Sequence, residues 1–149
     1  MKDDRNDSRR DSWQLRIEFH QEVKQALIRE QWTVTEAFQL EFGGRRIEID
    51  LAAERLIFAD RGLEKIAIEV KSFLNSSPMT DFHNAVGQFL NYQVILKRKE
   101  PDRTLYLAIP SEAYQSFFQS EFAKVAIEDH GIPLIVYNPV QEIIDQWIN

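Results

Sequence analysis

The chain has 149 residues, 44% of them hydrophobic, and a formal net charge of −6. This length suits one domain with a real core, and the acidic balance excludes a protein that coats nucleic acid through bulk charge, though not one with a local basic patch. Cysteine is absent, which excludes disulfides and thiolate metal sites. Because no apolar run suits a signal peptide or a membrane span, we expect a cytoplasmic protein without a membrane partner.

The N-terminal part of the chain divides into a polar tail and a helix. Residues 1–12 are polar and of mixed charge, which predicts a flexible tail before a single domain at 13–149. Apolar residues then recur at helical spacing from Trp13 to about Glu30, which predicts an amphipathic helix.

The next segment predicts a β-hairpin. Residues 32–35 and 38–42 favour one or two strands, and Gly43-Gly44 is a strong turn signal before a further strand at 47–51. Residues 51–59 combine a possible helical turn with strand-forming residues, and we interpret them as an interrupted strand.

Two runs of alternating apolar and polar residues, 47–51 and 65–71, predict strands that each bury one face. If these strands are neighbours in one sheet, Asp50, Glu69 and Lys71 converge on a single polar patch. Two carboxylates and an ammonium group at such a patch suit a hard-metal site. The residues predicted on the buried faces are Ile47, Ile49 and Leu51 in the first run and Ile66, Ile68 and Val70 in the second.

The second half of the chain alternates helical patterns with apolar strands, which predicts a mixed central sheet flanked by helices, an α/β fold. The predicted elements are a helix from Thr80 to about Leu96, a strand at 105–109, a helical region at 110–128 that ends near His130-Gly131, a strand at 134–137 and, from a poorer alternation, a strand at 140–148.

The order of these motifs resembles the PD-(D/E)xK endonuclease core. Asp50 is followed on the next alternating strand by Glu69-Val70-Lys71 and then by a helix, and Gln88 with Tyr92 resembles the Gln-x-x-x-Tyr element of RecB-type nucleases. The chain departs from the motif at Ile49, where the motif's name has proline. The resemblance implies a restriction-endonuclease-like fold.

Longer phrases of the sequence are similar to the XisH family over nearly the whole chain from about Phe19. XisH proteins are cyanobacterial factors that, with a small partner called XisI, control excision of the fdxN element during heterocyst development, while the recombinase is a separate protein. The resemblance therefore implies a factor in site-specific DNA rearrangement whose partners are DNA, an XisI-like protein and the recombinase, with a homo-oligomer as a further expectation. The similar phrases are DLAAER at 50–55, KIAIEVKSF at 65–73, AVGQ at 85–88, PDRTLYLA at 101–108 and QWI at 146–148.

Phosphodiester hydrolysis needs a Lewis acid and a deprotonated water, and Mg²⁺ or Mn²⁺ held by carboxylates supplies both. Asp50 and Glu69 would be the metal ligands, with the Val70 carbonyl as a third. Lys71 would orient the attacking water or stabilise developing negative charge. A Glu-x-Lys pair on a strand is, however, more often a solvated ion pair.

Two further groups could complete this site. Gln88 and Tyr92 lie one helical turn apart and could face DNA or the metal-bound water, although an amide cap and core packing explain them as well. Glu18 or Glu22 on the first helix could add an outer carboxylate. His20, like His83, lacks ligand spacing, so we interpret both as surface or structural residues.

Basic residues near the hairpin and after the second long helix are candidates for phosphate contacts, although such charges are more often only solvated. Glu54 is interpreted as an ion-pair partner near Arg55 and not as a metal ligand. The phosphate-contact candidates are Arg45, Arg46, Arg55, Arg61 and Lys97-Arg98-Lys99.

Two functions of different classes follow. The first is a Mg²⁺-dependent nuclease, or a nuclease-fold DNA-binding factor, in the control of recombination. The alternative is a catalytically inactive nuclease-fold interaction module that bridges XisI and the recombinase.

Overall fold

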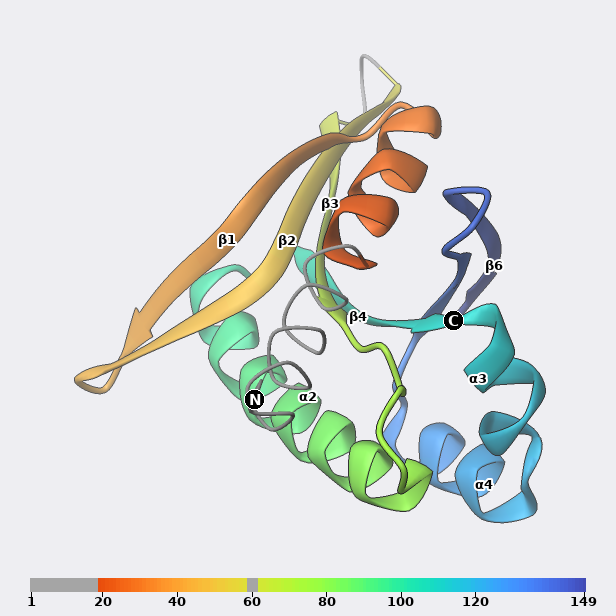
Figure 1. Cartoon of the computed structure of the whole chain (residues 1–149). Helices are drawn as coiled ribbons and strands as arrows, with labels where there is room; N and C mark the ends of the chain where they lie inside the picture. The colour runs from red at the N-terminus through yellow and green to blue at the C-terminus, as the bar shows by residue number, and fades with distance from the viewer. Residues whose placement is uncertain (1–18, 59–61) are drawn as a thin grey trace, which may run out of the picture.

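The computed structural model describes residues 19–58 and 62–149, so the predicted tail, the predicted helical residues 13–18 and Arg61 lie outside the described residues. The described residues form one six-stranded sheet with helices on both sides (Figure 1). The helices are the first helix at 19–29, α2 (Pro78–Lys99), α3 (Ser111–Gln115), the 3₁₀ helix η1 (Phe117–Gln119) and α4 (Glu121–His130). The strands are β1 (Thr33–Phe42), β2 (Arg45–Phe58), β3 (Gly62–Val70), β4 (Arg103–Pro110), β5 (Leu134–Asn138) and β6 (Ile143–Ile148).

The strands lie in chain order across the sheet. β1, β2 and β3 form an antiparallel meander, β3, β4 and β5 are parallel, and β6 returns antiparallel to β5. Parallel neighbours need a crossover connection, and α2 supplies the first while α3, η1 and α4 supply the second. The predicted mixed α/β sheet is therefore confirmed, and it is compatible with the endonuclease-like core.

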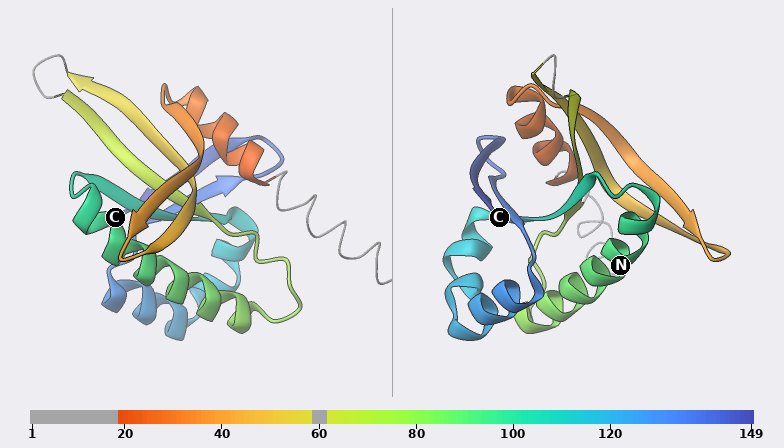
Figure 2. Two further views of the ribbon diagram at one scale, coloured as in Figure 1. Left: turned by 90° about the vertical axis from the view of Figure 1, so that its left-hand side faces the viewer. Right: turned by 180° about the vertical axis from the view of Figure 1, so that it is seen from behind.

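Each face of the sheet has its own apolar core. The first helix covers one face through Val23 and Leu27, while α2 covers the other through Phe82, Ala85 and Phe89 (Figure 2). η1 and α4 extend the second core with Phe118 and Ala123. No helix of the described residues is long and apolar enough to span a membrane.

β2 changes its facing at Asp50, where the predicted alternation is wrong. Ile49 packs in the core under α2, whereas Leu51 packs in the core under the first helix. Ala37 lies between the β1 partners of these two residues and has a left-handed backbone, with φ at 54°. Ile49 and Leu51 therefore do not share one face, and the change coincides with this left-handed residue on the neighbouring strand.

This change of facing coincides with the end of the β2–β3 ladder. The pairing of β2 with β3 runs from Leu51↔Ile68 towards Phe58, while β1 stays paired with β2 as far as the turn at Gly43-Gly44. Residues 51–58 are thus strand, and their pairing with β3 has a register shift between Leu56 and Phe58, while Ala59 of the predicted interrupted strand lies outside the described residues. The hairpin projects beyond the sheet, and Asp50 lies at the corner where it leaves β3.

The predicted helix end near His130-Gly131 is correct, whereas α2 begins two residues before the predicted Thr80 and ends three residues after the predicted Leu96. Ser77 caps α2 by accepting a hydrogen bond from the Thr80 N–H, and Gly131 ends α4 with a left-handed backbone, φ 64°. The single helical region predicted at 110–128 is instead three short pieces, because the chain turns at Ser116 and Ser120.

Candidate functional site

The structure brings Asp50 and Glu69 together at the corner where β2 leaves β3. Oδ2 of Asp50 accepts a hydrogen bond of 2.7 Å from the Val70 N–H, and the Glu69 carboxyl lies within hydrogen-bonding reach of Asp50. Glu69 is only 1% exposed. Two carboxyl groups in such a dry corner repel each other unless they share a proton or a cation. Val70 contributes its amide to this corner, and its predicted carbonyl ligation stays a prediction.

His20 belongs to the same corner, although the sequence alone predicts only a surface or structural role for it. Its Nε2 atom lies 3.4 Å from Asp50 Oδ2, and the two side chains are 24% and 10% exposed. The spacing between His20 and other potential ligands along the chain does not predict its contact with Asp50. It arises because the first helix packs across the sheet with Val23 and Leu27 inward, which places His20 over the end of the β2–β3 ladder.

Asp50 is held as a carboxylate. Burial raises the pKa of Asp50, but the contacts with His20, Glu69 and the Val70 N–H together outweigh burial and lower this pKa to about 2. The corner therefore keeps a negative charge at neutral pH, as a cation ligand must.

This lowered pKa predicts a pH-dependent stability. A carboxylate whose pKa falls on folding stabilises the protein above its ordinary pKa, and that stabilisation is lost as the pH falls through the folded value. We expect Asp50 to contribute about 2 kcal/mol at neutral pH, lost between about pH 4 and pH 2. Urea unfolding in EDTA from pH 2 to 6 measures it. Asp50→Asn should flatten this part of the profile, and a profile as steep as that of the original protein would contradict the assignment.

Tyr137 on β5 is a further neighbour of the corner. Its hydroxyl donates a hydrogen bond of 3.2 Å to the main-chain carbonyl of Lys71. Burial raises the pKa of Tyr137, and the negative charges of Glu22 and Asp50 raise it further, so both carboxylates lie near the hydroxyl. Glu22, predicted as an outer carboxylate, thus has the Tyr137 hydroxyl as a neighbour in common with Asp50, while Glu18 lies outside the described residues.

Gln88 and Tyr92 pair with each other on α2. The Gln88 amide donates a hydrogen bond of 2.8 Å to the Tyr92 hydroxyl, and both side chains are partly buried. Tyr92 also packs against the core under α2. The pairing leaves the hydroxyl proton of Tyr92 able to point elsewhere. The catalytic roles of Gln88, Tyr92 and Lys71 stay predictions.

The predicted phosphate-contact residues separate into two groups. Arg45 and Arg46 are exposed at the start of β2. Arg55 instead pairs with Glu64 at 2.9 Å, and its guanidinium lies 4.5 Å from the Trp32 ring centroid, which gives it a structural role. Glu54 forms an ion pair as predicted, but its partner is Arg103, at 3.1 Å.

The donor set limits the kind of metal the corner could hold. Within residues 19–58 and 62–149, no group of three or more His, Asp and Glu side chains is arranged to hold a metal ion. The corner offers the carboxylates of Asp50 and Glu69. Mg²⁺ commonly binds through one or two carboxylates and keeps several waters, so this donor set fits Mg²⁺ better than a fully protein-ligated cation.

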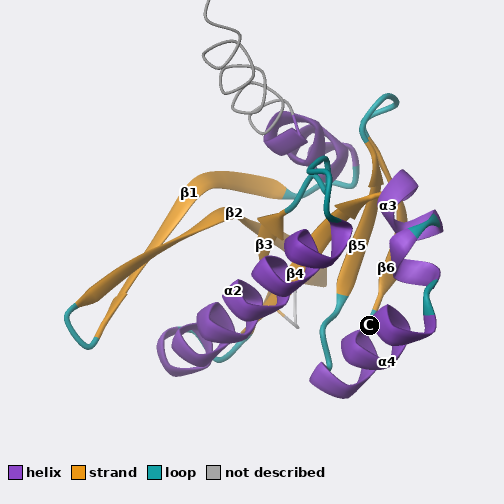
Figure 3. Ribbon diagram, turned by 60° about the horizontal axis from the view of Figure 1, so that its bottom comes forward, coloured by secondary structure: helices purple, strands orange, loops and turns teal. Residues whose placement is uncertain are grey.

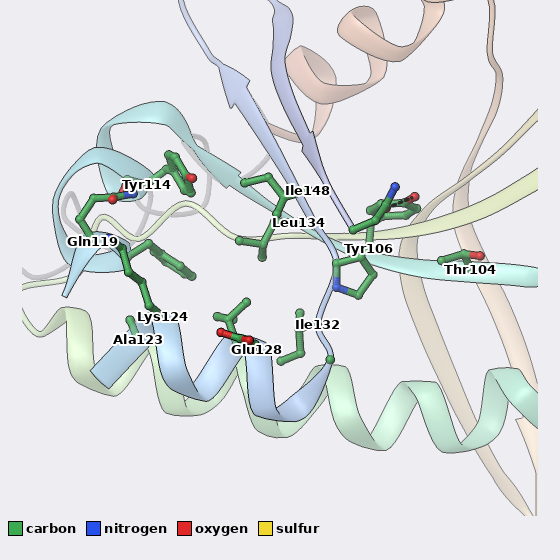
Figure 4. Close-up of a pocket in the computed structure, with 15 residues that line it drawn as sticks. Thr104, Tyr106, Tyr114, Gln119, Ala123, Lys124, Glu128, Ile132, Leu134 and Ile148 are labelled. Atoms are coloured by element: carbon green, nitrogen blue, oxygen red, sulfur yellow. Dashed lines mark hydrogen bonds between the residues drawn. The ribbon is translucent and has the colours of Figure 1, made fainter. Parts of the chain in front are cut away.

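A separate pocket of about 830 Å³ opens between α4, the start of β5 and the C-terminal end of the chain (Figure 4). Its lining is mostly apolar, with Lys124 and Glu128 on the α4 side and Tyr106 hydrogen-bonded to Asn149 at 2.8 Å on the other. Asp50 and Glu69 are not among its lining residues.

The described residues thus define an α/β protein with a mixed six-stranded sheet and a buried acidic pair beside a hairpin. The model of the XisH protein family matches residues 14–145, and the chain belongs to this family.

Two solved structures are similar to the chain. An XisH family protein from Nostoc punctiforme PCC 73102 is 45% identical with a TM-score of 0.81, and the match covers 89% of this chain and 99% of that one. A fdxN element excision controlling factor protein from Anabaena variabilis is 44% identical with a TM-score of 0.81, covering 89% of this chain and 98% of that one. No protein with a curated description matches the sequence.

Proposed function

We propose that the chain is an excision controlling factor that acts in the cytoplasm in site-specific DNA rearrangement, such as excision of a fdxN element, and that Asp50 and Glu69 hold Mg²⁺ or Mn²⁺ for phosphodiester hydrolysis. The 44% identical relative from Anabaena variabilis, a fdxN element excision controlling factor protein, supports the first part. The second part is supported by one observation, the approach of the Glu69 carboxyl to the ionised Asp50 in a dry corner.

Each residue of the corner would have a separate role in hydrolysis. Mg²⁺ bound to Asp50 and Glu69 would supply a Lewis acid at the scissile phosphate and a water of lowered pKa. The Val70 N–H fixes the orientation of Asp50, and His20 is in reach of the same carboxylate, so it can hold a proton there. Lys71 would stabilise negative charge that develops on the phosphate.

A second candidate function is the inactive interaction module that bridges an XisI-like protein and the recombinase. Two exposed apolar side chains on α4, Phe122 and Val125, favour it, since each is 50% exposed beside a small hollow with Ala126. This module needs neither metal nor DNA, and complex formation with the partner would survive changes at the acidic corner.

Calorimetric titration with Mn²⁺ tests the proposed metal site. We expect one binding event in the original protein and its loss in Asp50→Asn and Glu69→Gln, because each change removes a ligand charge. Glu48→Gln is the matched control, since Glu48 is an exposed carboxylate on the same strand as Asp50. Absence of heat in the original protein, or heat unchanged in Asp50→Asn, would contradict the metal site and favour the interaction module.

A further inference from the structure

Cations from two distant segments gather around Phe42 at the end of the projecting hairpin. The Arg98 guanidinium carbon lies 5.9 Å, and Lys99 Nζ 6.0 Å, from the Phe42 ring centroid. Arg45 is the direct ladder partner of Phe42 and so shares its face of the hairpin. Figure 3 shows the last turn of α2 beside this hairpin. We call Phe42, Arg45, Arg98 and Lys99 the basic tip.

The charges of the basic tip are not neutralised by described carboxylates. Among the described residues, the ion pairs of Lys and Arg involve Lys24, Arg55, Lys65 and Arg103, and none involves a residue of the basic tip. This concentration of unpaired positive charge stands out in a chain with a net charge of −6. It marks the basic tip as the place where an acidic protein can attract a polyanion.

Helix stabilisation accounts for only part of this cluster. Basic residues in a last turn complement the helix dipole, and Arg98 Nη1 donates a hydrogen bond of 2.9 Å to the Val94 carbonyl. That role does not require Arg45 on the hairpin, nor an aromatic ring that stays 43% exposed between the cations. Exposed aromatic rings flanked by cations are typical of surfaces that follow a nucleic-acid strand, where bases stack on the ring.

We propose that the basic tip binds the phosphate backbone of a nucleic acid. The proposal rests on the proposed function in taking DNA as the ligand, and it names the surface that holds the DNA. From Arg45 to Asp50 the strand advances about 17 Å, at roughly 3.3 Å per residue. This length equals about five nucleotides at a rise of 3.4 Å. One DNA strand can therefore contact the basic tip and the acidic corner together.

Fluorescence anisotropy with a labelled duplex and a labelled single strand of equal length, in EDTA, tests this surface. We expect Arg45→Glu with Arg98→Glu to weaken binding by about tenfold or more and to lower the slope of log K against log salt by about 1.4 to 1.8, since each lost phosphate contact removes about 0.7 to 0.9. The control Arg29→Glu with Lys124→Glu changes the net charge equally on two exposed cations elsewhere, and it should change affinity less than threefold.

Phe42→Ala distinguishes a double-stranded from a single-stranded ligand. A loss confined to the single strand assigns the basic tip to base stacking, and equal small losses assign it to the backbone of a duplex; both outcomes support the proposal. Equal weakening by the two double variants, displacement of DNA by polyglutamate as readily as by unlabelled DNA, or no binding by the original protein would overturn it. Because the anisotropy assay contains EDTA, it measures binding without a metal ion. DNA binding that depends on the basic tip would therefore support this proposal even if cleavage and Mn²⁺ binding fail.

Discussion

Replacing Asp50 by asparagine is expected to reduce Mg²⁺-dependent cleavage of DNA by at least about 100-fold. Asparagine has the same shape and retains an oxygen that can accept the hydrogen bond from the Val70 N–H, so the corner of β2 should persist. The change removes the ligand charge that the proposed metal site needs, and it removes the carboxylate that His20 contacts. Cleavage of a labelled duplex in Mg²⁺ and in Mn²⁺ measures the effect, with circular dichroism to check the fold.

Two further variants make this result specific. Lys71→Ala should also abolish cutting, but it should leave Mn²⁺ binding in place, because Lys71 is proposed to act on the phosphate and not on the metal. Glu48→Gln should cut as the original protein does. If Asp50→Asn or Lys71→Ala cuts at the original rate, the catalytic assignment is wrong. The interaction module would then be the function that the fold supports.

The acidic pair was predictable from the sequence because local patterns determine it. Alternation over 65–71 correctly places Ile66, Ile68 and Val70 in one core, but the prediction that only one face is buried is wrong, because Ala67 on the opposite face lies in the other core. A strand with Asp50 precedes this run after a strong turn signal. Neighbouring strands in a meander are close in the chain, so little beyond the turns is needed to bring Asp50 near Glu69.

Contacts that depend on tertiary packing were not predictable in this way. His20 reaches Asp50 only because a helix crosses the sheet, and no spacing along the chain encodes that crossing. The change of facing at Asp50 coincides with a left-handed backbone at Ala37, and because alanine rarely adopts that conformation, the sequence does not predict it. Gly131, in contrast, was predicted because a left-handed helix end favours glycine.

Arg103 is the clearest case of a buried charge that sequence patterns hide. A lone arginine just before an apolar strand looks like a solvated strand end, yet Arg103 is only 8% exposed. Its Nη1 donates to the Ile66 and Ala53 carbonyls at 3.0 and 3.4 Å. Its Nη2 donates to Glu54 and Glu100 at 3.1 and 3.3 Å. One guanidinium thus joins β2, β3 and the end of α2.

Arg103→Ala is expected to lower the free energy of unfolding by about 3 kcal/mol, because it leaves buried carbonyls and two carboxylates without their donor and opens a cavity. The Glu54 side chain is 43% exposed, so solvent screens that pair and most of the loss comes from the buried carbonyls. Arg103→Lys should recover less than half of the lost free energy of unfolding, since an ammonium cannot span the same four acceptors.

Lys65→Ala is the control. Lys65 is the ladder partner of Arg103, and its pair with the 65% exposed Asp102 should contribute less than about 1 kcal/mol. Urea unfolding at pH 7 gives all three values, and an Arg103→Ala loss no larger than that of Lys65→Ala would show that the guanidinium does not hold the strands together.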